Sequence, residues 1–123
     1  MLPNNFTHRA QEAIQRAHMN AMDRGQTQLD PLHLASALLE QDDGIVPAMM
    51  RKLGVDLASL KSAVEEGLHK LPVGSQISAP PGQIFLSDQL AKSLQTADKA
   101  AREFGDKFIS SEHLFLGLIS GCT

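Results

Sequence analysis

The sequence predicts an all-α domain, and three observations support this fold class. Ala and Leu dominate the composition, and Phe is the only aromatic residue type, as is typical of helical proteins. Apolar residues recur every three or four positions over most of the chain, which is the period of a helix. A stretch near the start also returns near the end. With 123 residues, we expect a single domain over 1–123.

The first two helices have clear start and stop signals. Thr7 is a candidate N-cap, and Gly25 is a candidate stop for a helix whose apolar face carries mostly alanines. Asp30 followed by Pro31 is the clearest start in the chain, because proline suits the first turn and aspartate caps it. The buried face of this second helix consists of leucines and alanines over 32–39.

Two further helices follow after short connections. The stretch "DDGIVPAMMRKLG" predicts a short third helix that tolerates Pro47 only within its first turn and ends at Gly54. Asp56 is then a candidate cap for a fourth helix. Its apolar stripe comprises Leu57, Leu60, Ala63, Val64, Leu68 and Leu71.

A linker separates these four helices from the rest. Residues 72–84 are rich in proline, glycine and serine and show no helical period. Ser87 is then a candidate cap for a fifth helix, which ends at Gly105, and either Ser110 or Ser111 begins a sixth. Apolar positions in the fifth helix are Leu90, Leu94, Ala97, Ala101 and Phe104.

The chain contains an internal repeat. Residues 6–39 align without a gap to 86–119, at an offset of 80 positions. The identical pairs are Gln15 with Gln95, Ala17 with Ala97, Ala21 with Ala101, Gly25 with Gly105, His33 with His113, Leu34 with Leu114, and Leu38 with Leu118. We expect two related helical units that pack on each other, one over 6–71 and a partial one over 85–120.

Charge and cysteine content exclude several classes of protein. The formal net charge is -3 and the pI is about 5.9, so no basic surface is expected for nucleic acid or anionic membranes. No window approaches the roughly 18 apolar residues of a membrane span. Cys122 is the only cysteine, which excludes an intrachain disulfide and favours the cytoplasm.

The sequence offers little for catalysis or cofactors. It has no phosphate-loop motif and no nucleophile elbow, so we expect no enzymatic activity from this chain. Its histidines lack the spacing of a zinc site, and no metal or cofactor is expected. His33 and His113 are interpreted as structural histidines repeated by duplication. The methionines at 19, 22, 49 and 50 suit either an adaptable surface or the core, and the core is favoured.

Four stretches carry a resemblance to a known family. They are "NNFTHRAQEAIQRAHMNA", "DPLHLASALLEQDDGIVPAMMRKLGVD", "LPVGSQISAPPGQIFLS" and "GDKFISSEHLFLGLI". Together they resemble the N-terminal domain of the Clp/Hsp100 AAA+ unfoldases over nearly the whole chain. Within that family the resemblance is strongest to ClpB, with ClpC and ClpA second.

The resemblance implies a fold and a function. It implies two helical repeats related by a pseudo-twofold axis, mounted on a hexameric AAA+ ring. The implied function is capture of unfolded or aggregated polypeptide for a disaggregase of the stress response. A ClpC- or ClpA-like parent would instead imply docking of adaptor proteins. A free-standing regulatory domain is a third interpretation.

The resemblance also points to four site residues. Thr7, Asp106 and Glu112 match polar positions that ClpB-like proteins use in handling substrate, and Leu94 is the candidate for an apolar groove. Each has a structural alternative: a helix cap for Thr7, a turn for Asp106, a favourable place at a helix start for Glu112, and the core for Leu94.

The second repeat is expected to be truncated. Counterparts of the third and fourth helices would require residues to about position 151, whereas this sequence stops at Thr123. We therefore expect uncovered helix faces, and a chain that is less stable than a completed domain or that self-associates. Thermal melting and sedimentation beside a completed version test this expectation.

Overall fold

The computed structural model describes residues 5–26, 28–41, 44–71 and 85–120, and these form helices joined by short connections. The first part of the chain contains α1 (His8–Asp23), α2 (Pro31–Glu40), α3 (Ile45–Lys52) and α4 (Leu57–His69). The second part contains α5 (Asp88–Glu103) and α6 (Ser111–Ser120). Two strands of two residues each, β1 (Gln28–Leu29) and β2 (Phe85–Leu86), accompany them. The all-α prediction is confirmed.

The predicted helix starts are confirmed by side-chain caps. The Thr7 hydroxyl oxygen accepts from the Ala10 backbone N–H at 3.2 Å, and the Ser87 hydroxyl accepts from Leu90 at 3.1 Å. Asp30 and Asp56 cap α2 and α4 through the N–H two residues on, at 2.9 and 3.1 Å. Pro47 lies in the first turn of α3 and is buried, as the sequence requires.

Three helices end just before a glycine, as the sequence predicts. Gly25, Gly54 and Gly105 have φ of 70°, 78° and 77°, a backbone conformation that residues with a Cβ atom rarely adopt. The sixth helix begins at Ser111. Its first backbone bond runs from Leu114 N–H to the Ser110 carbonyl at 3.1 Å, so Ser110 occupies the cap position.

The two repeats interlock through short extended segments. β1 pairs in parallel with β2, with Leu29 opposite Leu86, and Phe6 forms a parallel bridge with Ile109. The offset of 80 positions exchanges these two pairs, because Leu29 corresponds to Ile109 and Phe6 to Leu86. This exchange is the signature of a pseudo-twofold axis between the copies.

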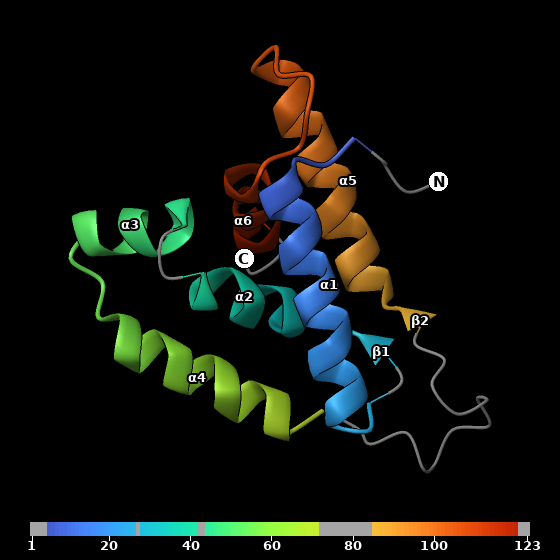
Figure 1. Ribbon diagram of the computed structural model, residues 1–123, viewed down its shortest axis with the longest axis vertical. Helices are drawn as coiled ribbons and strands as arrows, with labels where there is room; N and C mark the ends of the chain where they lie inside the picture. Colours follow the sequence, from blue (N-terminus) through green and yellow to red (C-terminus); the bar gives the residue numbers. More distant parts are fainter. Residues whose placement is uncertain (1–4, 27, 42–43, 72–84, 121–123) are drawn as a thin grey trace.

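The core lies between the helical pairs. In Figure 1 the blue α1 and the orange α5 run in roughly the same direction; α2 packs against α1, and α6 packs against α5. α4 packs against α2 at the side away from α5. Alanines fill the α1 face of the core, and leucines from α2, α5 and α6 complete it.

Several side chains differ from the sequence prediction. Met19 and Met22 are exposed, at 63% and 47%, so the core interpretation is wrong for them, whereas Met50 is buried. Ala63 is exposed because α4 presents only a narrow apolar edge to α2. Phe104 caps α5 and is 67% exposed rather than buried. The 72–84 linker lies outside the described residues, and the repeat boundaries and truncation stay predictions.

Candidate functional site

The N-terminus of α1 and the connection between α5 and α6 are bound together. Thr7 N–H donates to the Ile109 carbonyl at 2.9 Å, and Ile109 N–H donates to the Asn5 carbonyl at 2.8 Å. The Asn5 amide also donates to the Lys107 carbonyl at 2.8 Å. This places Thr7 beside the segment that carries Asp106 and Glu112.

Asp106 and Glu112 belong to one hydrogen-bonded chain. The buried His113 ring accepts at Nδ1 from the Ser110 backbone N–H at 2.9 Å, which leaves the hydrogen on Nε2. That nitrogen donates to Asp106 Oδ2 at 3.0 Å. The Ser110 hydroxyl donates to Glu112 Oε1 at 2.9 Å. The structure thus brings together the three predicted polar residues: Thr7 at the start of α1, Asp106 in the connection after α5, and Glu112 in the first turn of α6.

Leu94 lines an apolar pocket between the repeats. The pocket has a volume of about 100 Å³ and is lined by Phe6, Ile14, Ala17, Leu29, Leu34, Leu86, Leu90 and Leu94. Leu94 itself is only 5% exposed and forms part of the floor, while Phe6, Ile14 and Leu86 are half-buried at the rim. Because Phe6 precedes Thr7, the pocket and the polar residues are adjacent.

The repeat explains the shape of this pocket. Ile14 corresponds to Leu94 and Phe6 corresponds to Leu86, so two symmetry-related pairs face each other across the pseudo-twofold axis. The offset of 80 positions relates these residues to one another, but the sequence predicts only Leu94 as a groove residue. The other residues that line the pocket carry no signal in the sequence, because the pocket forms only where α1 approaches α5.

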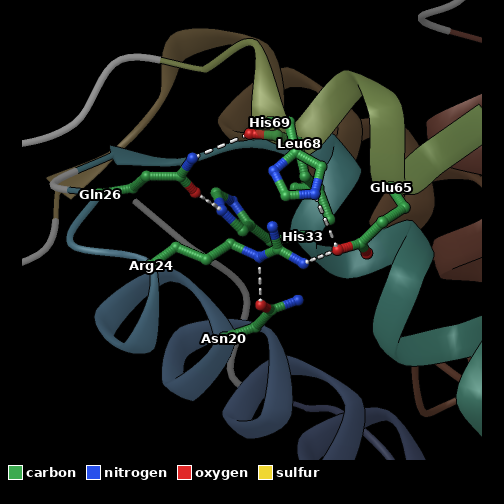
Figure 2. Close-up of polar contacts among 7 residues, drawn as sticks. All are labelled: Asn20, Arg24, Gln26, His33, Glu65, Leu68 and His69. Atoms are coloured by element: carbon green, nitrogen blue, oxygen red, sulfur yellow. Dashed lines mark hydrogen bonds and ion pairs between the residues drawn. The ribbon is translucent and has the colours of Figure 1, made fainter.

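The first repeat has an equivalent histidine in a different environment. His33 Nδ1 accepts from the Asp30 backbone N–H at 2.9 Å, and Nε2 donates to the Gln26 amide oxygen at 2.6 Å. The Gln26 amide nitrogen then donates to the Leu68 carbonyl of α4 at 2.9 Å, as Figure 2 shows. His33 therefore ties α2 and the α1–β1 turn to α4.

A second contact between α1 and α4 lies next to this histidine. The Arg24 guanidinium binds Glu65 and also donates to Asn20 at 2.7 Å (Figure 2). The hydrogen bond and charge of Arg24 lower the pKa of Glu65, with His69 adding a smaller effect at 3.6 Å. This cluster secures α4 and involves none of the predicted site residues.

Burial explains why His33 is structural. Desolvation lowers the pKa of His33 below 6.5, although Asp30 opposes this shift, so the ring is neutral at physiological pH. Both ring nitrogens are occupied by hydrogen bonds, which leaves no lone pair for a metal. Within the described part of the chain, no group of three or more His, Cys, Asp or Glu side chains is arranged to hold a metal ion.

These features define a class of protein: a duplicated all-α domain with a small apolar pocket on its pseudo-twofold axis and acidic residues beside it. The family model of the Clp repeat (R) N-terminal domain matches residues 5–122. The chain belongs to this family.

Proteins of known sequence support the assignment. ClpB from Nitratidesulfovibrio vulgaris is 37% identical over 114 residues, and ClpB from Gloeobacter violaceus is 38% identical over 114 residues. In both comparisons the matched part covers 93% of this chain and 13% of the relative. The chain thus spans about an eighth of the length of these relatives.

Solved structures share the fold. The Hsp104 N-terminal domain from Candida albicans matches with a TM-score of 0.85 at 24% identity, covering 96% of this chain and 75% of the other. The N-terminal domain of ClpV1 from E. coli matches with a TM-score of 0.82 at 22% identity, covering 94% and 68%. Among the described helices, none has both the length and the apolar character to cross a membrane.

Proposed function

We propose that this chain is the N-terminal substrate-binding module of a ClpB-like disaggregase and that it captures unfolded or aggregated polypeptide. The observation that carries the proposal is the apolar pocket with an open rim beside Thr7, Asp106 and Glu112. Unfolded chains differ from folded ones in exposing apolar side chains, and such a pocket binds these without requiring a fixed sequence.

The geometry suggests how a captured segment lies. One apolar side chain enters the pocket between Ile14 and Leu86, because its volume of about 100 Å³ suits a single aliphatic side chain. The segment then continues past Thr7 toward Asp106 and Glu112, which contribute polar contacts. ATP hydrolysis belongs to a AAA+ ring, so the module itself performs no catalysis. The proposal places the protein in the cytoplasm.

Binding of an unfolded model protein tests the proposal. Fluorescence anisotropy measures affinity for a model protein that is kept unfolded by chemical modification and for the same protein, unmodified, in its folded form. We expect Ile14→Trp, which fills the rim, to weaken binding of the unfolded form about tenfold, in keeping with loss of one buried aliphatic contact. Leu53→Ser is the control, since Leu53 is 72% exposed at the end of α3.

The polar residues need a separate set of variants. Thr7→Ala, Asp106→Ala and Glu112→Ala are compared by affinity and by thermal melting, with Thr7→Ser retaining the cap of α1. Weaker binding at unchanged melting temperature supports a binding role. Unchanged binding assigns these residues to caps and turns alone.

Adaptor docking is a second candidate. A ClpV N-domain that shares this fold has been solved in complex with a VipB peptide, so a domain of this type binds a defined peptide there. If this chain docks adaptors, it will bind a folded Clp adaptor and will not distinguish unfolded from folded forms of a model protein. The same anisotropy experiment separates the two candidates.

A further inference from the structure

Two exposed phenylalanines lie on the connection between α5 and α6. Phe104 is 67% exposed and Phe108 is 56% exposed, and Asp106 lies between them in sequence. This connection forms the end of the molecule at the top of Figure 1. An exposed aromatic ring forgoes the favourable free energy of burial, so two such rings at one turn indicate a candidate contact surface.

The first repeat shows that the turn does not need these rings. Gly25 and Gly105 have similar φ, and both turns are closed by backbone bonds from the residue after the glycine, at 3.0 Å from Gln26 and 2.8 Å from Asp106. The counterparts of Phe104 and Phe108 are Arg24 and Gln28, which are polar. The same turn therefore forms with polar residues at both positions.

The Phe104 ring and the Asp106 carboxylate are both held by His113. The Phe104 and His113 rings stack with centroids 6.1 Å apart at an interplanar angle of 29°. His113 Nε2 lies 3.0 Å from Asp106 Oδ2, and the aspartate side chain remains 51% exposed. An exposed ring and a half-exposed carboxylate are thus fixed next to each other.

The charge of this segment favours a positively charged binding partner. Residues 102–112 contain the carboxylates of Glu103, Asp106 and Glu112, the ammonium of Lys107, and the guanidinium of Arg102, which pairs with Asp98 of α5 at 3.2 Å. A cation is attracted both to the face of an aromatic ring and to a carboxylate. An acidic segment is repelled by the same charges.

We infer that Phe104, Phe108 and Asp106 form a contact surface for positively charged residues that flank the apolar side chain of a captured polypeptide. The inference rests on the proposed function and names its substrate class: apolar segments with Lys or Arg beside them. Phe6, at the pocket rim, is bridged to Ile109 of the same connection, so the pocket and this surface are neighbours. The pocket then binds the apolar side chain while the surface binds the positively charged residue next to it.

Three labelled peptides test the inference with the full chain. They share a central Leu-Ile-Leu and differ only in flanking lysines, glutamines or glutamates. By fluorescence anisotropy we expect the lysine peptide to bind about fivefold more tightly than the glutamine peptide, and the glutamate peptide to bind most weakly. Added salt should reduce the difference.

The repeat provides matched variants. Asp106→Asn removes the charge and keeps an oxygen that accepts from His113, as Gln26 does for His33. The double variant Phe104→Gln with Phe108→Gln places polar residues where the first repeat has them. We expect each variant to reduce the preference for the lysine peptide over the glutamine peptide to about twofold or less.

The outcomes separate this inference from the proposed function. Equal binding of the three peptides by the unaltered chain, or an unchanged preference in Asp106→Asn and in the double variant, overturns the inference and leaves capture intact. Failure of the unaltered chain to bind any of the three overturns both. Ile14→Trp should weaken all three peptides equally.

Discussion

His33 and His113 occupy the same position in the two copies but donate to different partners. His33 donates to the neutral amide of Gln26, and His113 donates to the carboxylate of Asp106. In both, Nδ1 accepts from the N–H of the helix cap, so each histidine fixes the first turn of its helix. As a result, the histidine of the first copy only joins buried elements, whereas the histidine of the second copy holds a carboxylate at the surface.

The buried His33 predicts how stability depends on pH. Its pKa is lowered in the folded state, mainly by desolvation, so below about pH 6.5 the unfolded chain binds a proton that the folded chain does not. The free energy of unfolding should therefore fall as the pH drops from 6.5 toward the folded-state pKa, and this contribution is constant above 6.5. Urea titrations between pH 5 and 8 measure it.

His33→Gln is the matched variant for this measurement. Glutamine at this position accepts from the N-cap N–H as in a capping box, but it does not titrate. We expect a flatter pH profile for the variant between pH 5 and 6.5. An identical slope in both proteins would mean that another group controls the transition.

The helical pairs α1–α2 and α5–α6 are copies of each other, but the two helices approach more closely in the second pair. Gly117 in α6 faces the α5 backbone, and a Cβ built there would lie 2.2 Å from the Ser93 carbonyl oxygen. The corresponding residue in α2 is Ala37, which is buried at 2% exposure. Only the second pair therefore requires a glycine at this contact.

Gly117→Ala should destabilise the domain even though alanine favours helix formation. Separating two packed backbones costs about 1–3 kcal/mol, against a gain of about 1 kcal/mol in helix propensity. Chemical denaturation should show a clear net loss that reaches about 2 kcal/mol. The reciprocal Ala37→Gly should cost about 2 kcal/mol, about 1 from helix propensity and about 0.8 from loss of a buried methyl group. A more stable Gly117→Ala protein would contradict the close contact.

The whole molecule is held together where the two copies exchange segments. Ile109 is fully buried, and its backbone is bonded to Asn5 and Thr7, more than a hundred positions earlier in the chain. Leu29 and Leu86 form the equivalent contact on the other side of the pseudo-twofold axis. The shared core makes independent unfolding of either repeat unfavourable.

Ile109→Ala should weaken both repeats together. Loss of a buried isoleucine side chain typically costs about 2–5 kcal/mol. Hydrogen exchange should then show reduced protection in α1 as well as in α5, with a single unfolding transition. Ile119→Ala, at a residue that is 47% exposed, is the control. Loss of protection confined to α6 would show that the copies unfold separately.

The sequence was sufficient for the helices, the repeat and the family because these depend on local interactions. A cap such as Asp30 bonds within its own first turn, and a glycine such as Gly105 ends its own helix. No contact distant in sequence is needed for any of these features.

Only the tertiary structure decided which apolar residues line the pocket and which are exposed. Leu94 lies in the pocket floor because α1 approaches α5 there, whereas Met19 and Phe104 point to solvent although they also fit a helical period. Likewise, His113 meets Asp106 only because the turn after α5 folds back over α6. These contacts join side chains from separate elements, so helical periodicity cannot encode them.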